Sequence, residues 1–137
     1  MSVAAHVEHF TELLIVLRRH FDGDLDRMLV MAIIGLRTMP ARVVEEVSYR
    51  DFKTKPVVKD PGPINVQSIA DTSGIPRETV RRKVQALEEA GLVERHDGGH
   101  LVVSGQARAI LSPATEATMR YLVAVGAACT AAASRNR

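Results

Sequence analysis

Five side chains that can hydrogen-bond to base edges cluster near the middle of the chain. Residues 75–93, placed on a helix that turns about 100° per residue, separate into a polar face and an apolar face. An arginine can bind guanine through two hydrogen bonds, a glutamine can pair with adenine, and a glutamate can accept from the cytosine amino group. The pattern therefore predicts a helix that reads bases in the major groove of DNA. The predicted base-reading residues are Arg77, Glu78, Arg81, Arg82 and Gln85.

The opposite face of this helix is apolar. Val80, Val84 and Leu87 follow the spacing i, i+4, i+7, which is typical of a helix face buried in a core. Thr79 and Lys83 lie off the polar face, where contacts with DNA phosphates are expected. The helix is thus predicted to be anchored by one side and to present the other side to DNA.

A short helix and a turn are predicted directly before this stretch. Residues 66–73 form a helix candidate in which Ile69 and Ala70 face inward. Gly74 can supply a sharp turn, because glycine adopts a positive φ without strain. Ala70, Gly74 and Val80 have the spacing of a helix-turn-helix unit, in which a small residue permits close helix crossing and the valine fills the space between the helices.

A hairpin is predicted after the second helix, which we expect to end at Gly91. Residues 92–96 and 100–103 have strand character, and residues 97–99 (D-G-G) lie between them. Asp-Gly favours a tight turn, because such turns need positive φ. Helix, turn, helix and hairpin follow each other in the order of a winged helix. The wing residues expected near the DNA backbone are Arg95, His96 and His100.

The stretch resembles the recognition helix of the cyclic-AMP receptor protein family, which carries R-E-T-V-x-R followed by L-E-x-x-G-L/I. This chain has P-R-E-T-V-R-R-K-V-Q-A-L-E-E-A-G-L-V there, and the resemblance covers residues 67–103. It implies base-reading roles for Arg77, Glu78 and Arg82. Pro76 stands where that family usually has a capping serine. The rest of the chain does not resemble a cyclic-nucleotide β-roll, and helices on both sides of a winged helix are more similar to the MarR class of dimeric regulators.

Apolar helices are predicted on both sides of the winged helix. The first carries a heptad-like seam, in which apolar residues recur at alternating steps of four and three. The seam residues are Val3, Val7, Phe10, Leu14, Leu17 and Phe21. A second helix over residues 25–39, capped by Asp24, is apolar nearly all round, so a partner subunit is an economical way to bury it. A last helix over residues 114–133 follows Ser112-Pro113. Its apolar side includes Met119, Leu122, Val123 and Gly126.

These elements predict a mainly α fold with a small β-hairpin wing, flanked by dimerisation helices. N-terminal helices occupy residues 1–52, including a third helix candidate at 41–52, and a loop with three lysines follows at 53–63. The winged helix-turn-helix occupies residues 64–111, and a C-terminal helix and tail occupy 112–137. We expect one compact domain overall.

Composition limits the classes of function that remain. The 137 residues are 46% hydrophobic, which indicates a globular chain large enough for a core. A net charge of +2 does not by itself indicate nucleic acid, but the local arginine cluster does. The absence of tryptophan and the 4% aromatic content disfavour binding of single strands by base stacking. The lone cysteine, and the lack of an evident signal peptide or long apolar span, predict a cytoplasmic protein.

Other chemistry has weaker support. His6, His9 and Glu12 have helical spacing that could hold a metal ion, but no cysteine or further carboxylate pattern completes the site. Cys129 lies in an alanine-rich helix, where a small packed thiol is expected. A glycine-rich phosphate loop and a nucleophile–base pair are both missing, so we predict no catalytic residue, no metal and no cofactor.

The sequence therefore predicts a homodimeric, cytoplasmic transcriptional regulator that binds double-stranded DNA sequence-specifically and is not an enzyme. A small-molecule effector is a further candidate partner, and no membrane partner is expected. The main alternative is a winged-helix module that binds another protein without binding DNA. A weaker alternative is a small metal-dependent enzyme built on the N-terminal histidines.

Overall fold

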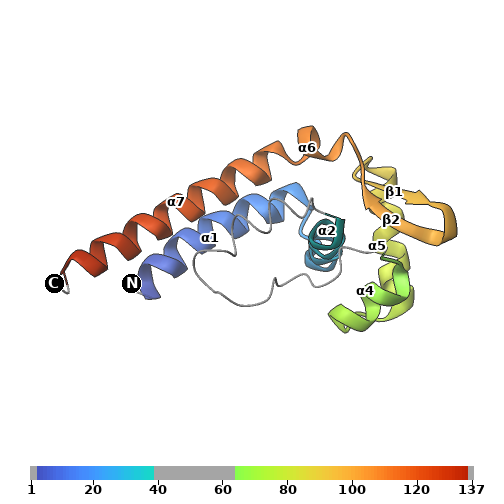
Figure 1. Cartoon of the computed structure of the whole chain (residues 1–137), viewed down its shortest axis with the longest axis horizontal. Helices are drawn as coiled ribbons and strands as arrows, with labels where there is room; N and C mark the ends of the chain where they lie inside the picture. The colour runs from blue at the N-terminus through green and yellow to red at the C-terminus, as the bar shows by residue number, and fades with distance from the viewer. Residues whose placement is uncertain (1–2, 39–63, 136–137) are drawn as a thin grey trace. The chain divides into compact units, whose positions relative to one another are not determined.

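The computed structural model describes residues 3–38 and 64–135, and Figure 1 shows its elements. These residues are mainly helical with one two-stranded antiparallel sheet, which confirms the predicted fold class of a winged helix with flanking helices. The elements are α1 (Val3–His20), α2 (Leu25–Thr38), α4 (Val66–Ser73), α5 (Arg77–Glu89), β1 (Val93–His96), β2 (His100–Val103), α6 (Ala107–Ile110) and α7 (Ser112–Arg135). The third helix candidate and the lysine-bearing loop lie outside the described residues.

The chain divides into two compact units. One unit consists of Met1–Leu25 and Arg108–Arg137, and the other is Asp26–Ala107. This division places most of α2 with the winged helix, and the single compact domain that we expected stays a prediction. Val30 and Ile34 of α2 are fully buried, as expected of a helix that is apolar nearly all round.

In the first unit, α1 and α7 lie side by side and run in opposite directions (Figure 1). The buried contact is made by Leu13 of α1 and by the small residues Ala114 and Ala117 of α7. A polar contact adds to it, since the His6 Nδ1 atom lies 2.8 Å from the Tyr121 hydroxyl. The ring of Phe10 stacks on that of His6 with centroids 5.2 Å apart. The two terminal segments of the chain therefore fold together.

The predicted seam of α1 is mostly on the outside of this unit. Val7 is 53% exposed and Leu14 is 37% exposed, whereas the neighbouring Leu13 is buried. Phe21 at the end of the seam is buried as well. Phe10 of the seam also contacts α7, since its ring centroid lies 5.9 Å from that of Tyr121. Helix α1 thus meets α7 through Leu13 and part of the seam, while Val7 and Leu14 stay exposed.

The helix-turn-helix has the geometry that the glycine pattern predicted. Asn65 caps α4, because its Oδ1 atom accepts a hydrogen bond from the Ser68 N–H at 2.9 Å. Gly74 ends α4 with φ +77°, and its N–H donates to the Ala70 carbonyl at 2.9 Å. Helix α5 begins one residue after Pro76, which occupies the N-cap position. The missing serine is therefore compatible with an ordinary helix start.

The apolar face of α5 lies in the core of the second unit. Val80, Val84 and Leu87 are each fully buried, as the i, i+4, i+7 spacing predicted. Ile69 of α4 is also fully buried, whereas Ala70 is only half-buried. Because α5 is held on this side, its opposite side is fixed in orientation and remains exposed.

The wing is an antiparallel pair in which Val93 faces Val103 and His96 faces His100. A 3-10 turn at Asp97–Gly99 joins the strands, and both of its glycines have positive φ. The N–H of Leu101 donates to the Ile64 carbonyl at 2.8 Å, so the chain before α4 pairs with the wing. The predicted hairpin is present. Its last pair, His96 with His100, leaves three residues in the loop.

None of the described helices is long and apolar enough to cross a membrane. Cys129 is exposed on α7, so the expectation of a packed thiol is wrong. The physical reason is that α7 is buried near its start, at Ala114 and Ala117, and its later turns are largely open to solvent.

Candidate nucleic-acid interface

The five predicted base-reading side chains are all exposed on α5. They emerge from the side of the helix that lies away from the core, because the three buried residues of α5 occupy the other side. A surface helix with one rigidly packed face can present its outer face to the major groove, which is about 12 Å wide. The structure therefore provides the presentation that base reading needs. The role of each side chain stays a prediction.

Two of these five side chains bind each other. The Arg81 Nη2 atom lies 2.6 Å from Glu78 Oε1, and Arg81 Nε lies 3.0 Å from Glu78 Oε2. The hydrogen bond from Arg81 lowers the pKa of the Glu78 carboxyl group, and the charges of Arg82 and Arg77 lower it further. The carboxylate in turn raises the pKa of Arg81. Glu78 is therefore ionised at neutral pH, with its charge balanced on the helix surface.

A groove of about 600 Å³ lies between the start of α4, the first turns of α5 and the wing. It brings together four of the predicted site residues, namely Arg77, Glu78, Arg81 and Arg95. Two of its three arginines form ion pairs, Arg81 with Glu78 and Arg95 with Glu88. The lining of three arginines and one glutamate still carries an excess of positive charge, which attracts anions such as phosphate. The groove therefore suits a segment of a sugar–phosphate backbone beside the recognition helix.

The groove also contains residues that the sequence analysis missed. Asn65 and Gln67 line it from the first turn of α4, and Gly98 and Gly99 line it from the wing. Asn65 could have been predicted from the sequence, because asparagine is a frequent helix cap and it stands directly before the helix candidate that begins V-Q-S. A helix start in such a groove adds backbone N–H groups that favour a negative ligand.

The other predicted contacts with the DNA backbone are on the wing and on α5. Arg95 forms an ion pair with Glu88 of α5, with 2.9 Å between Nη2 and Oε1, so the wing is tied to α5. His96 is exposed and lies 3.4 Å from Glu94, and His100 is half-buried. Thr79 and Lys83 are half-buried on α5. Their predicted contacts with the DNA backbone stay predictions.

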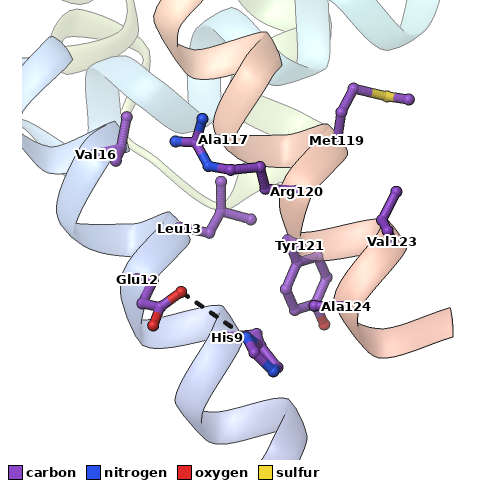
Figure 2. A pocket seen from close by; sticks show the side chains of 10 residues that line it. All are labelled: His9, Glu12, Leu13, Val16, Ala117, Met119, Arg120, Tyr121, Val123 and Ala124. Atoms are coloured by element: carbon purple, nitrogen blue, oxygen red, sulfur yellow. Dashed lines mark ion pairs between the residues drawn. The ribbon is translucent and has the colours of Figure 1, made fainter. Parts of the chain in front are cut away.

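A second concavity lies in the other unit, between α1 and α7 (Figure 2). Its volume is about 610 Å³, and its walls are mostly apolar. Figure 2 shows Leu13 of α1 and Tyr121 of α7 in the space between the helices, and Arg120 extending from α7. At its edge His9 Nδ1 lies 3.8 Å from Glu12 Oε2.

The histidines of α1 are arranged differently from a metal site. His6 contacts the Tyr121 hydroxyl, and His9 lies near Glu12. Within residues 3–38 and 64–135, no group of three potential ligands of the histidine, cysteine or carboxylate type is close enough to hold a metal ion. The described part of the chain therefore offers no support for the metal-dependent alternative.

Comparison with known families finds a match over the winged helix. Residues 57–114 match the family model described as the sugar-specific transcriptional regulator TrmB. The matched segment is less than half of the chain and contains α4, α5 and the wing. It supports a helix-turn-helix transcriptional regulator, whereas the similarity to the cyclic-AMP receptor protein and MarR families is not confirmed. Searches of curated proteins and of solved structures found no match.

Proposed function

We propose that the similarity to TrmB regulators extends to function, so that this chain binds duplex DNA sequence-specifically and regulates transcription. One observation carries the proposal. All five candidate base-reading side chains are exposed on α5, while Val80, Val84 and Leu87 on its other side are fully buried. A merely solvated helix face would not need a wing tied to it through an arginine, nor a groove with three guanidinium groups beside it.

Base reading and backbone binding fall to different residues in this proposal. Arg77, Glu78 and Arg82 set the sequence preference from the exposed face of α5. Lys83 and Arg95 supply affinity through phosphates, which carry no sequence information. Gln85 extends the reading surface by one helical turn, and the wing histidines lie against the backbone.

Selection of bound sequences from a random duplex pool tests the proposal. The wild-type protein should enrich one motif, and Arg82→Ala should cost about 1–3 kcal/mol at one base position and relax discrimination there. Arg108→Ala is the matched control, because Arg108 is an exposed arginine outside α5 and the wing. A wild-type selection that returns no motif would contradict sequence-specific binding. It would favour the alternative of a module that binds another protein.

Exposed apolar residues support a homodimer through the terminal helices. Val7 and Leu14 of α1 are exposed, and Leu122 of α7 is 55% exposed. Large exposed apolar patches are uncommon on monomers, and a two-fold dimer buries the same patch twice. Such a dimer presents two recognition helices to half-sites spaced by one DNA turn, roughly 34 Å.

The groove between α1 and α7 is where we place the small-molecule effector. Its volume of about 610 Å³ falls within the range of ligand pockets. Arg120 and Glu12 place one cation and one carboxylate among mostly apolar walls, so a mainly apolar effector with a polar group fits best. Arg120→Gln should abolish the effector's influence on DNA affinity and leave DNA binding without effector unchanged. A cytoplasmic location, where DNA is accessible, belongs to the same proposal.

A further inference from the structure

Helix α2 has a second apolar face, on the other side from the residues that lie in a core. Val30 and Ile34 are fully buried on the core side. The other face is a stripe of apolar residues that recur at steps of four, three and four, and all of them are exposed. This α2 stripe consists of Leu25, Leu29, Ala32 and Leu36, and its leucines are 66%, 40% and 44% exposed.

The spacing of the α2 stripe is that of a coiled-coil seam. Steps of four and three keep side chains on one line along a helix, so that they can insert between the side chains of a second helix. Single exposed leucines are ordinary on protein surfaces, whereas a continuous apolar stripe without a charged residue marks a contact surface. The α2 stripe therefore fits another helix that carries the same spacing.

The α2 stripe is complementary to itself when two copies of α2 run antiparallel. A two-fold axis between residues 29 and 32 places Leu29 opposite the partner's Ala32. The same axis places Leu25 opposite the partner's Leu36. The larger side chain at the centre then fills the space that the small one leaves, as close packing requires. A parallel pair would set alanine against alanine and leave a gap.

Charge favours the same orientation. The first turn of α2 carries Asp26, and its last turn carries Arg37. Antiparallel helices bring the acidic start of one copy beside the basic end of the other, and their macrodipoles are opposed as well. A parallel pair would place like charges together at each end.

We propose that α2 is a second self-association surface, which pairs antiparallel with α2 of another copy through Leu29 and Ala32. Helix α2 has 14 residues, so it is about 21 Å long. One helix face of this length buries less than the roughly 800 Å² per partner of a standard interface. The α2 contact is therefore weak by itself, and it goes beyond the dimer proposed through the terminal helices.

An exchange of side-chain size between the two central positions tests this contact. The full chain with Leu14→Asp is the background, because it lacks the proposed α1 contact, and sedimentation equilibrium up to about millimolar protein measures the self-association that is left. Leu29→Ala and Ala32→Leu should each raise its Kd by roughly 10-fold or more, the first through a cavity and the second through overpacking. The double variant Leu29→Ala/Ala32→Leu should bring the Kd back to within about threefold of the background.

Mixing the two single variants distinguishes a contact between copies from a contact within one copy. A heterodimer of Leu29→Ala and Ala32→Leu chains sets alanine opposite leucine at both positions, so it should form as tightly as the background pair. Leucine and alanine are both strong helix formers, so neither variant should weaken α2, and circular dichroism checks this. Ala127→Leu, at an exposed position of α7, is the matched control and should leave the Kd unchanged.

Two results would overturn the inference. Absence of self-association of the Leu14→Asp chain at millimolar concentration would leave the α2 stripe to another part of the chain or to a different protein. A mixture that associates as weakly as each single variant would exclude the antiparallel pairing. A wild-type chain that is already monomeric at micromolar concentration contradicts the dimer through the terminal helices, but the comparison of the α2 variants is unaffected by it.

Discussion

Replacing Gly74 by alanine tests whether the turn of the helix-turn-helix depends on backbone conformation alone. Gly74 has φ +77°, a region that L-residues rarely adopt. Among the described residues, an added Cβ atom there would have no neighbour within 4 Å. The substitution therefore creates no clash and no cavity, and its effect isolates the cost of the left-handed conformation.

The expected magnitude follows from two opposing effects. Holding an L-residue in the left-handed region costs roughly 1–2 kcal/mol. Alanine also lowers the conformational entropy of the unfolded chain, and this effect offsets part of the conformational cost in the folded state. The net loss of unfolding free energy should therefore be about 1 kcal/mol. Gly35 in α2 is the matched control, because an added Cβ would again meet no described atom within 4 Å, but there the backbone is helical. Gly35→Ala should stabilise the protein by about 0.5–1 kcal/mol.

Urea unfolding followed by circular dichroism measures both values. Wild type and the two variants are compared at one protein concentration, because the stability of the proposed dimer would depend on concentration. The two substitutions should shift the unfolding midpoint in opposite directions with unchanged slopes. A neutral or stabilising Gly74→Ala would show that the turn does not need this conformation, and the derivation of the α4–α5 geometry would fail.

Three further results are expected. Leu14→Asp should convert the proposed dimer to a monomer in analytical ultracentrifugation, because it would bury an unpaired charge in the dimer interface on α1. Thr115→Asp, at an exposed polar position, should leave the dimer intact. A wild-type monomer at micromolar concentration would contradict the proposed dimer. Ser104→Ala should lower the unfolding free energy by about 1–3 kcal/mol, because the buried hydroxyl donates at 2.6 Å to the carbonyl that follows α5; an unchanged urea midpoint would refute this. Carbon-detected NMR should show that the pKa of the Glu78 carboxyl group lies below its ordinary value. The ion pair between Glu78 and Arg81 is then fully formed at pH values above the ordinary pKa of glutamate, and it is lost as the pH falls through the lowered pKa. Arg81→Ala should raise this pKa, and an unchanged titration would argue against the pair in solution.

Local sequence patterns sufficed for the winged helix. The face of Val80, Val84 and Leu87 follows from helical spacing, and the turn at Gly74 follows from the conformational freedom of glycine. The wing follows from strand character on either side of Asp-Gly-Gly. Each of these features depends on neighbours within a few residues, which is why a single sequence carries enough information to predict it.

Features that depend on distant contacts could not be derived in this way. Helix α1 has two adjacent apolar faces, and periodicity does not say whether Leu13 or Leu14 meets α7. The grouping of α2 with the winged helix depends on packing between distant segments of the chain. The pairing of Glu78 with Arg81 is a choice among side-chain rotamers, and helical spacing permits it without requiring it.

Fluorescence anisotropy of a labelled duplex carrying the selected motif, measured between roughly 50 and 200 mM salt, tests the central claim most directly. If the dimer makes about 6–10 phosphate contacts, its affinity should fall by about 10³- to 10⁵-fold over this range, along a straight line in log Kd against log salt. A scrambled duplex of the same length should bind far more weakly at every salt concentration. Absence of duplex binding at 50 mM salt, or equal binding of the scrambled duplex, would contradict the account of α5 as a recognition helix.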